Sequence, residues 1–112
     1  MTQVQIGGNM YPADVTGRLV DASWSGRESK EITLSMTYAD AAALFVNGAA
    51  WSIVLDVEQA DGTTVQETYD NSDFSIAGDL TDHRDGTVTV KMGKPTELEN
   101  ALALLLGGEG NV

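Results

Sequence analysis

Hydrophobic and polar residues alternate in two runs that flank a short helical pattern near the middle of the chain. Every second residue of these runs is apolar: Ile32, Leu34 and Met36 in the first, and Trp51, Ile53, Leu55 and Val57 in the second. This is the pattern of strands that bury one face. Between them, Thr37 is a helix N-cap and Asn47-Gly48 is suited to the C-terminal cap. The sequence therefore predicts that a strand, helix and strand over residues 31–57 organise the fold.

The helix of this central unit has an apolar stripe at helical spacing. It is formed by Tyr38, Ala41, Ala42 and Phe45. The small alanines allow a helix to approach a sheet closely. We expect the stripe to face the core.

Other strand patterns precede and follow the central unit. A small hairpin is predicted at Gly7-Gly8-Asn9, with Pro12 limiting its return strand, and a separate strand over residues 15–22 with a bulge or a close backbone contact at Gly17. Asp61-Gly62 predicts a tight hairpin turn, because this dipeptide tolerates positive φ angles. A second hairpin loop is predicted over residues 82–86.

The last helix begins at a capping box, in which Thr96 and Glu99 satisfy each other's backbone donors after Pro95, and it is expected to end at Gly107-Gly108. One stripe, assigned to the core, consists of Leu98, Ala101, Leu102 and Leu105. Leu104 and Leu106 lie on either side of it and widen the apolar arc to roughly 200°. Such a helix either inserts deeply into its own fold or meets another chain. We favour the second alternative, which makes Leu104 and Leu106 predicted partner contacts.

The chain has the size of one domain. Its 112 residues are 42% hydrophobic, enough for a core. We expect one globular domain over residues 1–108, with a frayed tail over 109–112. The fold class is α+β: a mostly antiparallel sheet of six to eight strands, forming a partial barrel or sandwich, with two short helices covering one face or an open end.

The charge of the chain is strongly negative and unevenly distributed. The formal net charge is −11, and residues 56–85 hold nine acidic side chains and one basic one. Because such a surface repels phosphates, direct binding to nucleic acid or to an anionic membrane is not expected. The sequence has no cysteine and no apolar run near the ~20 residues of a membrane span. A protein of the cytoplasm, or of a virion assembled there, is the expectation.

The residues that carry catalysis are sparse. The single histidine, His83, falls in a predicted hairpin loop, and the sequence contains no GxSxG, GxxxxGK[ST] or HExxH motif. We therefore expect no enzyme activity and no cofactor. Asp79, Asp82 and Asp85 offer oxygen ligands, but their spacing does not fit an EF-hand loop, so no metal ligands are predicted.

Trp24 is a large aromatic residue in the polar segment SWSGRESK. Beside Arg27, it is a candidate anchor for a protein partner. The alternative is that Trp24 folds back as a lid on one end of the core. Both possibilities remain open from the sequence.

Three segments, SWSGRESKEITLSM, YADAAALFVNGAAWSIV and HRDGTVTVKMGKPTELENALALLLGG, resemble small proteins that lie among head and tail genes of phages and prophages of gut bacteria. The resemblance covers residues 23–108 and implies a role in the virion or its assembly. We therefore expect a non-enzymatic structural or assembly protein that self-associates or binds other phage-type structural proteins. The alternatives are an acidic DNA mimic or inhibitor, supported by the charge of residues 56–85, and a calcium- or carbohydrate-binding β module, supported by the Asp-rich turns and Trp24.

Overall fold

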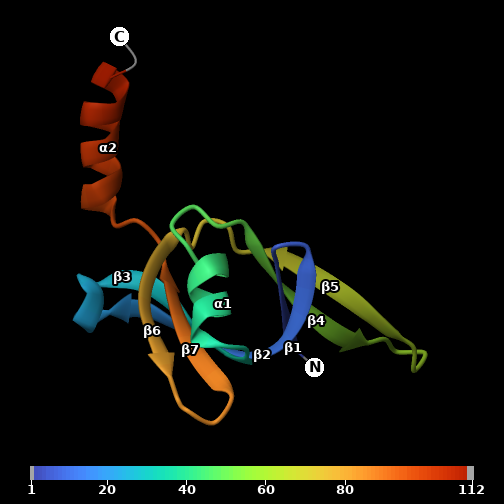
Figure 1. The fold of residues 1–112 in the computed structure, drawn as a ribbon. Coiled ribbons are helices and arrows are strands. Elements are labelled where there is room, and N and C mark those ends of the chain that lie inside the picture. The colour runs from blue at the N-terminus through green and yellow to red at the C-terminus, as the bar shows by residue number, and fades with distance from the viewer. Residues whose placement is uncertain (1, 111–112) are drawn as a thin grey trace.

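The computed structural model describes the backbone of residues 2–110 and the side chains of residues 2–105. It contains seven antiparallel strands, two α-helices and a short 3-10 helix (Figure 1). The strands are β1 (Thr2–Ile6), β2 (Asn9–Asp21), β3 (Arg27–Ser35), β4 (Trp51–Glu58), β5 (Thr64–Asp70), β6 (Ile76–Asp82) and β7 (Thr87–Gly93). The helices are η1 (Ala22–Trp24), α1 (Tyr38–Leu44) and α2 (Glu97–Gly110). The predicted α+β class is confirmed.

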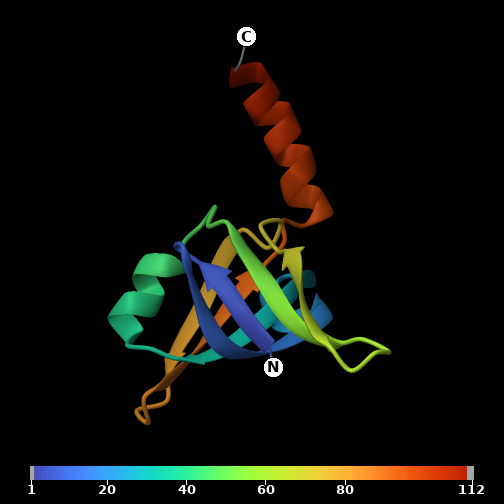
Figure 2. The same ribbon diagram turned by 90° about the vertical axis from the view of Figure 1, so that its right-hand side faces the viewer.

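The strands form one open sheet in the order β5-β4-β1-β2-β3-β7-β6. The sheet curves around a common interior, and α1 lies against one side of it (Figure 2). Each of the three predicted hairpins is present, as β1–β2, β4–β5 and β6–β7. The predicted strand, helix and strand over residues 31–57 are present as β3, α1 and β4, but the central strand of the sheet is β2, and β3 and β4 are not neighbours.

β2 is one continuous strand of 13 residues that runs through Pro12. Its first half pairs with β1, where Pro12 lies opposite Gln3, and pairing with β3 begins only at Ala13. Proline interrupts a strand only where its missing N–H is needed, and here it lies at the point where the strand changes partners. Gly17 pairs regularly with Lys30, and the irregularity lies further along, between Arg18 and Asp21.

The core lies between the two halves of the curved sheet. Alternate residues of β1, β3 and β7 are buried in it: Val4, Ile6, Ile32, Leu34, Val88, Val90 and Met92. Trp51 closes the core with edge-to-face contacts to Phe45 and Phe74, at centroid distances of 6.5 and 6.4 Å. Its indole N–H also donates to the carbonyl of Phe74. This cluster of three aromatic rings ties β4 to the segments before and after the β4–β5 hairpin.

The two helices differ in how they pack. In α1, Thr37 accepts a hydrogen bond from the Asp40 N–H at 3.1 Å, as predicted for the N-cap. Ala41 and Phe45 are buried, whereas Tyr38 and Ala42 of the predicted stripe are exposed. The described side chains of α2 are all exposed, and the helix projects from the sheet (Figures 1 and 2). The prediction that both helices cover the sheet therefore holds for α1 alone.

Candidate functional site

Trp24 lies at the end of η1 and packs against two glycines of the sheet. A methyl group at Gly78 of β6 or Gly93 of β7 would approach the indole ring to 2.6 or 2.8 Å. The glycines are thus required by the close approach of the ring rather than by a turn. Trp24 is half-buried and folds back onto β6 and β7, but it is not among the hydrophobic residues packed against the core, which the lid alternative requires.

A buried aspartate holds the segment that carries Trp24. Asp21 is 1% exposed, and its carboxylate accepts hydrogen bonds from Ser23 at 2.6 Å, from Ser29 at 3.0 Å and from the Lys91 ammonium at 2.8 Å. The hydrogen bond from Lys91, followed by that from Ser23, holds the pKa of Asp21 well below its usual range. Asp21 therefore fixes the turn into β3 and leaves Lys91 beneath the Trp24 ring, 5.8 Å from its centroid.

Arg27 connects this cluster to the base of α2. Its guanidinium lies 4.8 Å from the Trp24 ring centroid and donates to both carboxylate oxygens of Glu99, at 2.6 and 2.9 Å. It also donates to the Lys94 carbonyl at 3.0 Å, in the link between β7 and α2. Arg27 is only 7% exposed. Geometry of this kind, with two parallel charge-assisted hydrogen bonds, fixes both the position and the direction of the partner.

Glu99 has two roles at this junction. Its carboxylate accepts from the Thr96 N–H at 2.8 Å, and its own N–H donates to the Thr96 hydroxyl at 3.1 Å. The predicted capping box is confirmed. The hydrogen bonds from Arg27, with the charge of the guanidinium, lower the pKa of Glu99 to about 2. The first turn of α2 is therefore both capped and anchored to the sheet by one side chain.

Beyond its base, α2 exposes a set of leucines to solvent. The exposed fractions of Leu98, Leu102, Leu104 and Leu105 are 69%, 46%, 78% and 62%. The stripe assigned to the core from the sequence is thus exposed, together with Leu104. Leu106 lies on α2, but its side chain is outside the part of the chain that the structure describes. The helix continues through the Gly107-Gly108 pair that was expected to end it and reaches Gly110.

The structure places three of the four predicted contact residues, and they lie in two different settings. Trp24 and Arg27 are neighbours, as predicted, but they hold the base of α2, and Arg27 is enclosed by Glu99 and Trp24. Leu104 lies on the projecting helix and is free to meet a partner. The pairing of Arg27 with Glu99 joins residues 72 positions apart, and no local spacing in the sequence indicates it.

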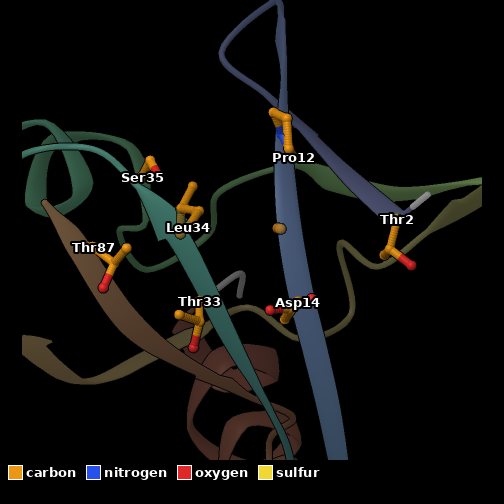
Figure 3. Close-up of a pocket in the computed structure, with 8 residues that line it drawn as sticks. Thr2, Pro12, Asp14, Thr33, Leu34, Ser35 and Thr87 are labelled. Carbon is orange, nitrogen blue, oxygen red and sulfur yellow. The ribbon is translucent and has the colours of Figure 1, made fainter.

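Two grooves lie elsewhere on the surface of the molecule. The first, of about 350 Å³, lies between β2 and β3 (Figure 3). It is lined by Thr2, Pro12, Ala13, Asp14, Thr33, Leu34, Ser35 and Thr87. Asp14 is the one titratable group among these lining residues, and within the described residues no hydrogen bond joins its carboxylate to the hydroxyl of Thr33, Ser35 or Thr87, as an activated nucleophile requires.

The second groove, of about 460 Å³, lies over Ile53, Leu55 and Phe74. The ammonium groups of Lys30 and Lys94 lie 4.4 and 4.9 Å from the centroid of the Phe74 ring. Lys94 also pairs with Glu28 and Asp73, and Lys30 donates to the side chain of Asn71. Burial lowers the pKa of Lys30. The two cations are engaged by the protein's own groups, which is the arrangement of a structural cluster.

The polar turns use their side chains locally. Asp61, Asp70 and Asp85 each accept a backbone N–H two residues further on, at 3.0 Å. His83 is exposed and contacts the Thr89 hydroxyl at 2.7 Å. Among the described residues, no group of three or more His, Cys, Asp or Glu side chains is placed to hold a metal ion. Within the same residues, no helix has the length and apolar character required to cross a membrane.

Comparisons of the chain with known proteins give no match. No family model, no curated protein and no solved structure matches it.

Proposed function

We propose that the protein is a non-enzymatic structural or assembly protein of the phage or prophage type, and that it acts through protein–protein contacts made by α2. The observation that supports this proposal is the exposure of the leucines on a helix that projects from the sheet. A helix of 14 residues is marginal in water unless its apolar face is packed. The ion pair at its base fixes where the helix points, and the leucines of the helix remain exposed.

The partner we propose is a second copy of the chain, because each copy supplies the same apolar helix. Burying a leucine fully contributes about 1.5–3 kcal/mol. At half burial, the eight leucines of two described helices contribute on the order of 6–12 kcal/mol, against an association cost of at least about 4 kcal/mol. Micromolar affinity requires about 8 kcal/mol. The contact is therefore weak and concentration-dependent, as suits subunits that are gathered by an assembly.

Charge opposes this association. Each copy carries a formal net charge of −11, so salt that screens the repulsion should strengthen the contact. An association driven by ion pairs would respond to salt in the opposite direction. The salt dependence thus separates an apolar contact through α2 from a charged one.

The test is sedimentation of the wild type and two variants at increasing concentration and at low and high salt. Leu104→Glu places a charge on the apolar arc of α2 and should give a folded monomer. Ala103→Glu places the same charge on an exposed residue of the same helix, about 100° away from Leu104, and should leave the oligomer largely intact. A wild type that remains monomeric at high concentration and high salt would refute self-association through α2.

A further inference from the structure

β5 is an edge strand with nothing along its outer side in the described part of the chain. It lies at one end of the sheet and pairs only with β4. Its register runs from Asp70 to Thr64 without a shift, and all seven of its residues are exposed. A regular, exposed edge presents unpaired backbone groups to any strand that can add to it.

The opposite edge of the sheet shows how this chain protects a strand. In β6 the register shifts between Ala77 and Leu80, and Trp24 packs against Gly78 within the irregular segment. The Ala77 N–H is already bound by the side chain of Asn47, at 2.8 Å. Bulges and covering side chains are the usual means by which edges are blocked. In the described residues β5 has no register shift, and the side-chain hydrogen bond that reaches its backbone, from the Asn71 amide to the Tyr69 carbonyl at 3.0 Å, lies at a group directed toward β4.

The backbone groups that point away from β4 can be identified. The Asn71 N–H donates to the Trp51 carbonyl, and the Gln59 N–H donates to the Thr63 carbonyl. Because hydrogen-bonded pairs alternate along an antiparallel ladder, the pairs at Val65, Glu67 and Tyr69 are directed toward β4. Gln66 and Thr68 alternate with these residues, so their N–H and C=O groups point away from β4, toward the free side of the strand.

The charge of the β4–β5 hairpin indicates what kind of strand fits this edge. Residues 56–70 contain five acidic side chains and no lysine or arginine, and these acidic side chains are all exposed. A second β5 strand would bring the same charges together, and like charges on neighbouring strands are destabilising. A basic segment is attracted instead. The edge is thus suited to a partner of opposite charge rather than to a second copy of this chain.

The side chains of β5 specify the pattern of that segment. Val65, Glu67 and Tyr69 lie on one face of the strand, and Val65 and Tyr69 are 41% and 48% exposed. The Tyr69 hydroxyl donates to the Glu67 carboxylate, which keeps the acid between the two apolar groups. Side chains directly opposite one another across a pair of strands form the stabilising contacts. A basic residue opposite Glu67, with apolar residues opposite Val65 and Tyr69, complements this face.

We propose that the free edge of β5 binds an extended segment of another protein with the pattern apolar-x-Lys/Arg-x-apolar. The segment adds to the sheet as an antiparallel eighth strand. Backbone hydrogen bonds to Gln66 and Thr68 supply binding, and the basic residue opposite Glu67 supplies selectivity. This contact uses the edge opposite to β6 and is independent of the leucines of α2.

The test is a titration of the ¹⁵N-labelled protein with the synthetic peptide TVTKTVT, blocked at both ends and followed by amide chemical shifts. The expected result is saturable shifts at Gln66 and Thr68, with slower amide exchange at both. TVTETVT reverses the central charge, and TTVKVTT has the same composition as the test peptide but places lysine and valine on opposite faces. Each should bind at least tenfold more weakly, and added salt should weaken the binding of TVTKTVT.

A protein variant tests the backbone contact. Gln66→Pro removes an N–H that points away from β4, a position where an edge strand tolerates proline, and should weaken binding at least tenfold. Gln66→Ala keeps the N–H and should bind as the wild type does. Leu104→Glu should also bind as the wild type does, since α2 is not involved.

Modified peptides give the same information without changing the protein. N-methylation of the two threonines that flank the lysine blocks the groups facing β5 and should abolish the shifts. N-methylation of the backbone nitrogen of the lysine blocks an N–H that points away from β5, so binding should persist. Absence of shifts at Gln66 and Thr68 with TVTKTVT, or equal binding of TVTKTVT and TTVKVTT, would overturn the proposal.

Discussion

The guanidinium of Arg27 and the carboxylate of Glu99 form a two-point ion pair that joins β3 to the first turn of α2. The two N–O distances are 2.6 and 2.9 Å, and Arg27 is nearly buried whereas Glu99 is partly exposed. The pair determines where the projecting helix starts. Its loss leaves a buried guanidinium without its carboxylate, which is costlier than loss of an exposed ion pair.

Glu99→Gln should therefore loosen α2 while leaving the sheet folded. We expect amide exchange in the first turn of α2 to accelerate by roughly tenfold or more, while protection in β3 and β7 changes little. Glu97→Gln, which removes a charge from the same turn but is not bonded to Arg27, is the matched control. Equal acceleration by the two variants would mean that helix charge, rather than the ion pair, holds α2.

The attachment of α2 should also depend on pH. Its ion pair with Arg27 lowers the pKa of Glu99 from 4.5 to about 2. A carboxyl group whose pKa is lowered in the folded state stabilises that state at pH values above its ordinary pKa. This stabilisation is lost as the pH falls from 4.5 toward 2. The indole N–H resonance of Trp24, which lies beneath Arg27, should shift in this range. The same resonance in Glu99→Gln should lack that transition.

Phe45→Ala should destabilise the protein by roughly 3–5 kcal/mol in chemical denaturation, because it removes a buried ring from the contact with Trp51 and leaves a cavity. Phe45 is 5% exposed, whereas Tyr38 is 51% exposed. Tyr38→Ala is the control and should change the free energy of unfolding by no more than about 0.5 kcal/mol. Similar costs for both variants would show that Phe45 is not a specific core residue.

Substitution of Gly62 should destabilise the protein according to whether the new side chain is branched at Cβ, and not according to its size. Its φ is +86°, and a Cβ at this position would meet no other atom within 4 Å. Gly62→Val should cost about 1–3 kcal/mol through backbone strain, and Gly62→Asn less than about 1 kcal/mol. Thermal unfolding of both variants gives the comparison. A variant pair with identical melting temperatures would contradict the assignment of this turn.

The turns and caps could be predicted because each depends on a few neighbouring residues. Thr37 caps α1, Thr96 and Glu99 form the capping box, and Gly62 adopts positive φ. The loop around Gly62 is wider than predicted: the Gly62 N–H bonds the Gln59 carbonyl, so Ala60 and Asp61 form the turn and Gly62 follows it.

The features that could not be predicted depend on distant partners. Pro12 was expected to limit the return strand, and the pairing of β2 with β1 does end there, but β2 continues without a break into the predicted separate strand because β3 becomes its neighbour at Ala13. The apolar stripe of α2 indicated packing on the sheet, yet Leu98 and Leu105 are exposed, since amphipathic spacing does not say which molecule supplies the other surface. The pairing of Arg27 with Glu99 is likewise visible only in three dimensions. For the candidate site, the sequence identified the helix and its leucines but not the anchor that positions it.

The strand order also bears on how the protein is made. β1, β2 and β3 leave the ribosome first and form the middle of the sheet, after which β4–β5 adds beside β1 and β6–β7 adds beside β3. Val4 pairs with Ile53, and Ile32 with Val90, so the β1 flank of the nascent three-stranded sheet stays open until β4 is made, and the β3 flank stays open until β7 is made. Open strand edges of this kind are where nascent chains aggregate. Synthesis that stalls before β7 would therefore leave β3 as an exposed apolar edge.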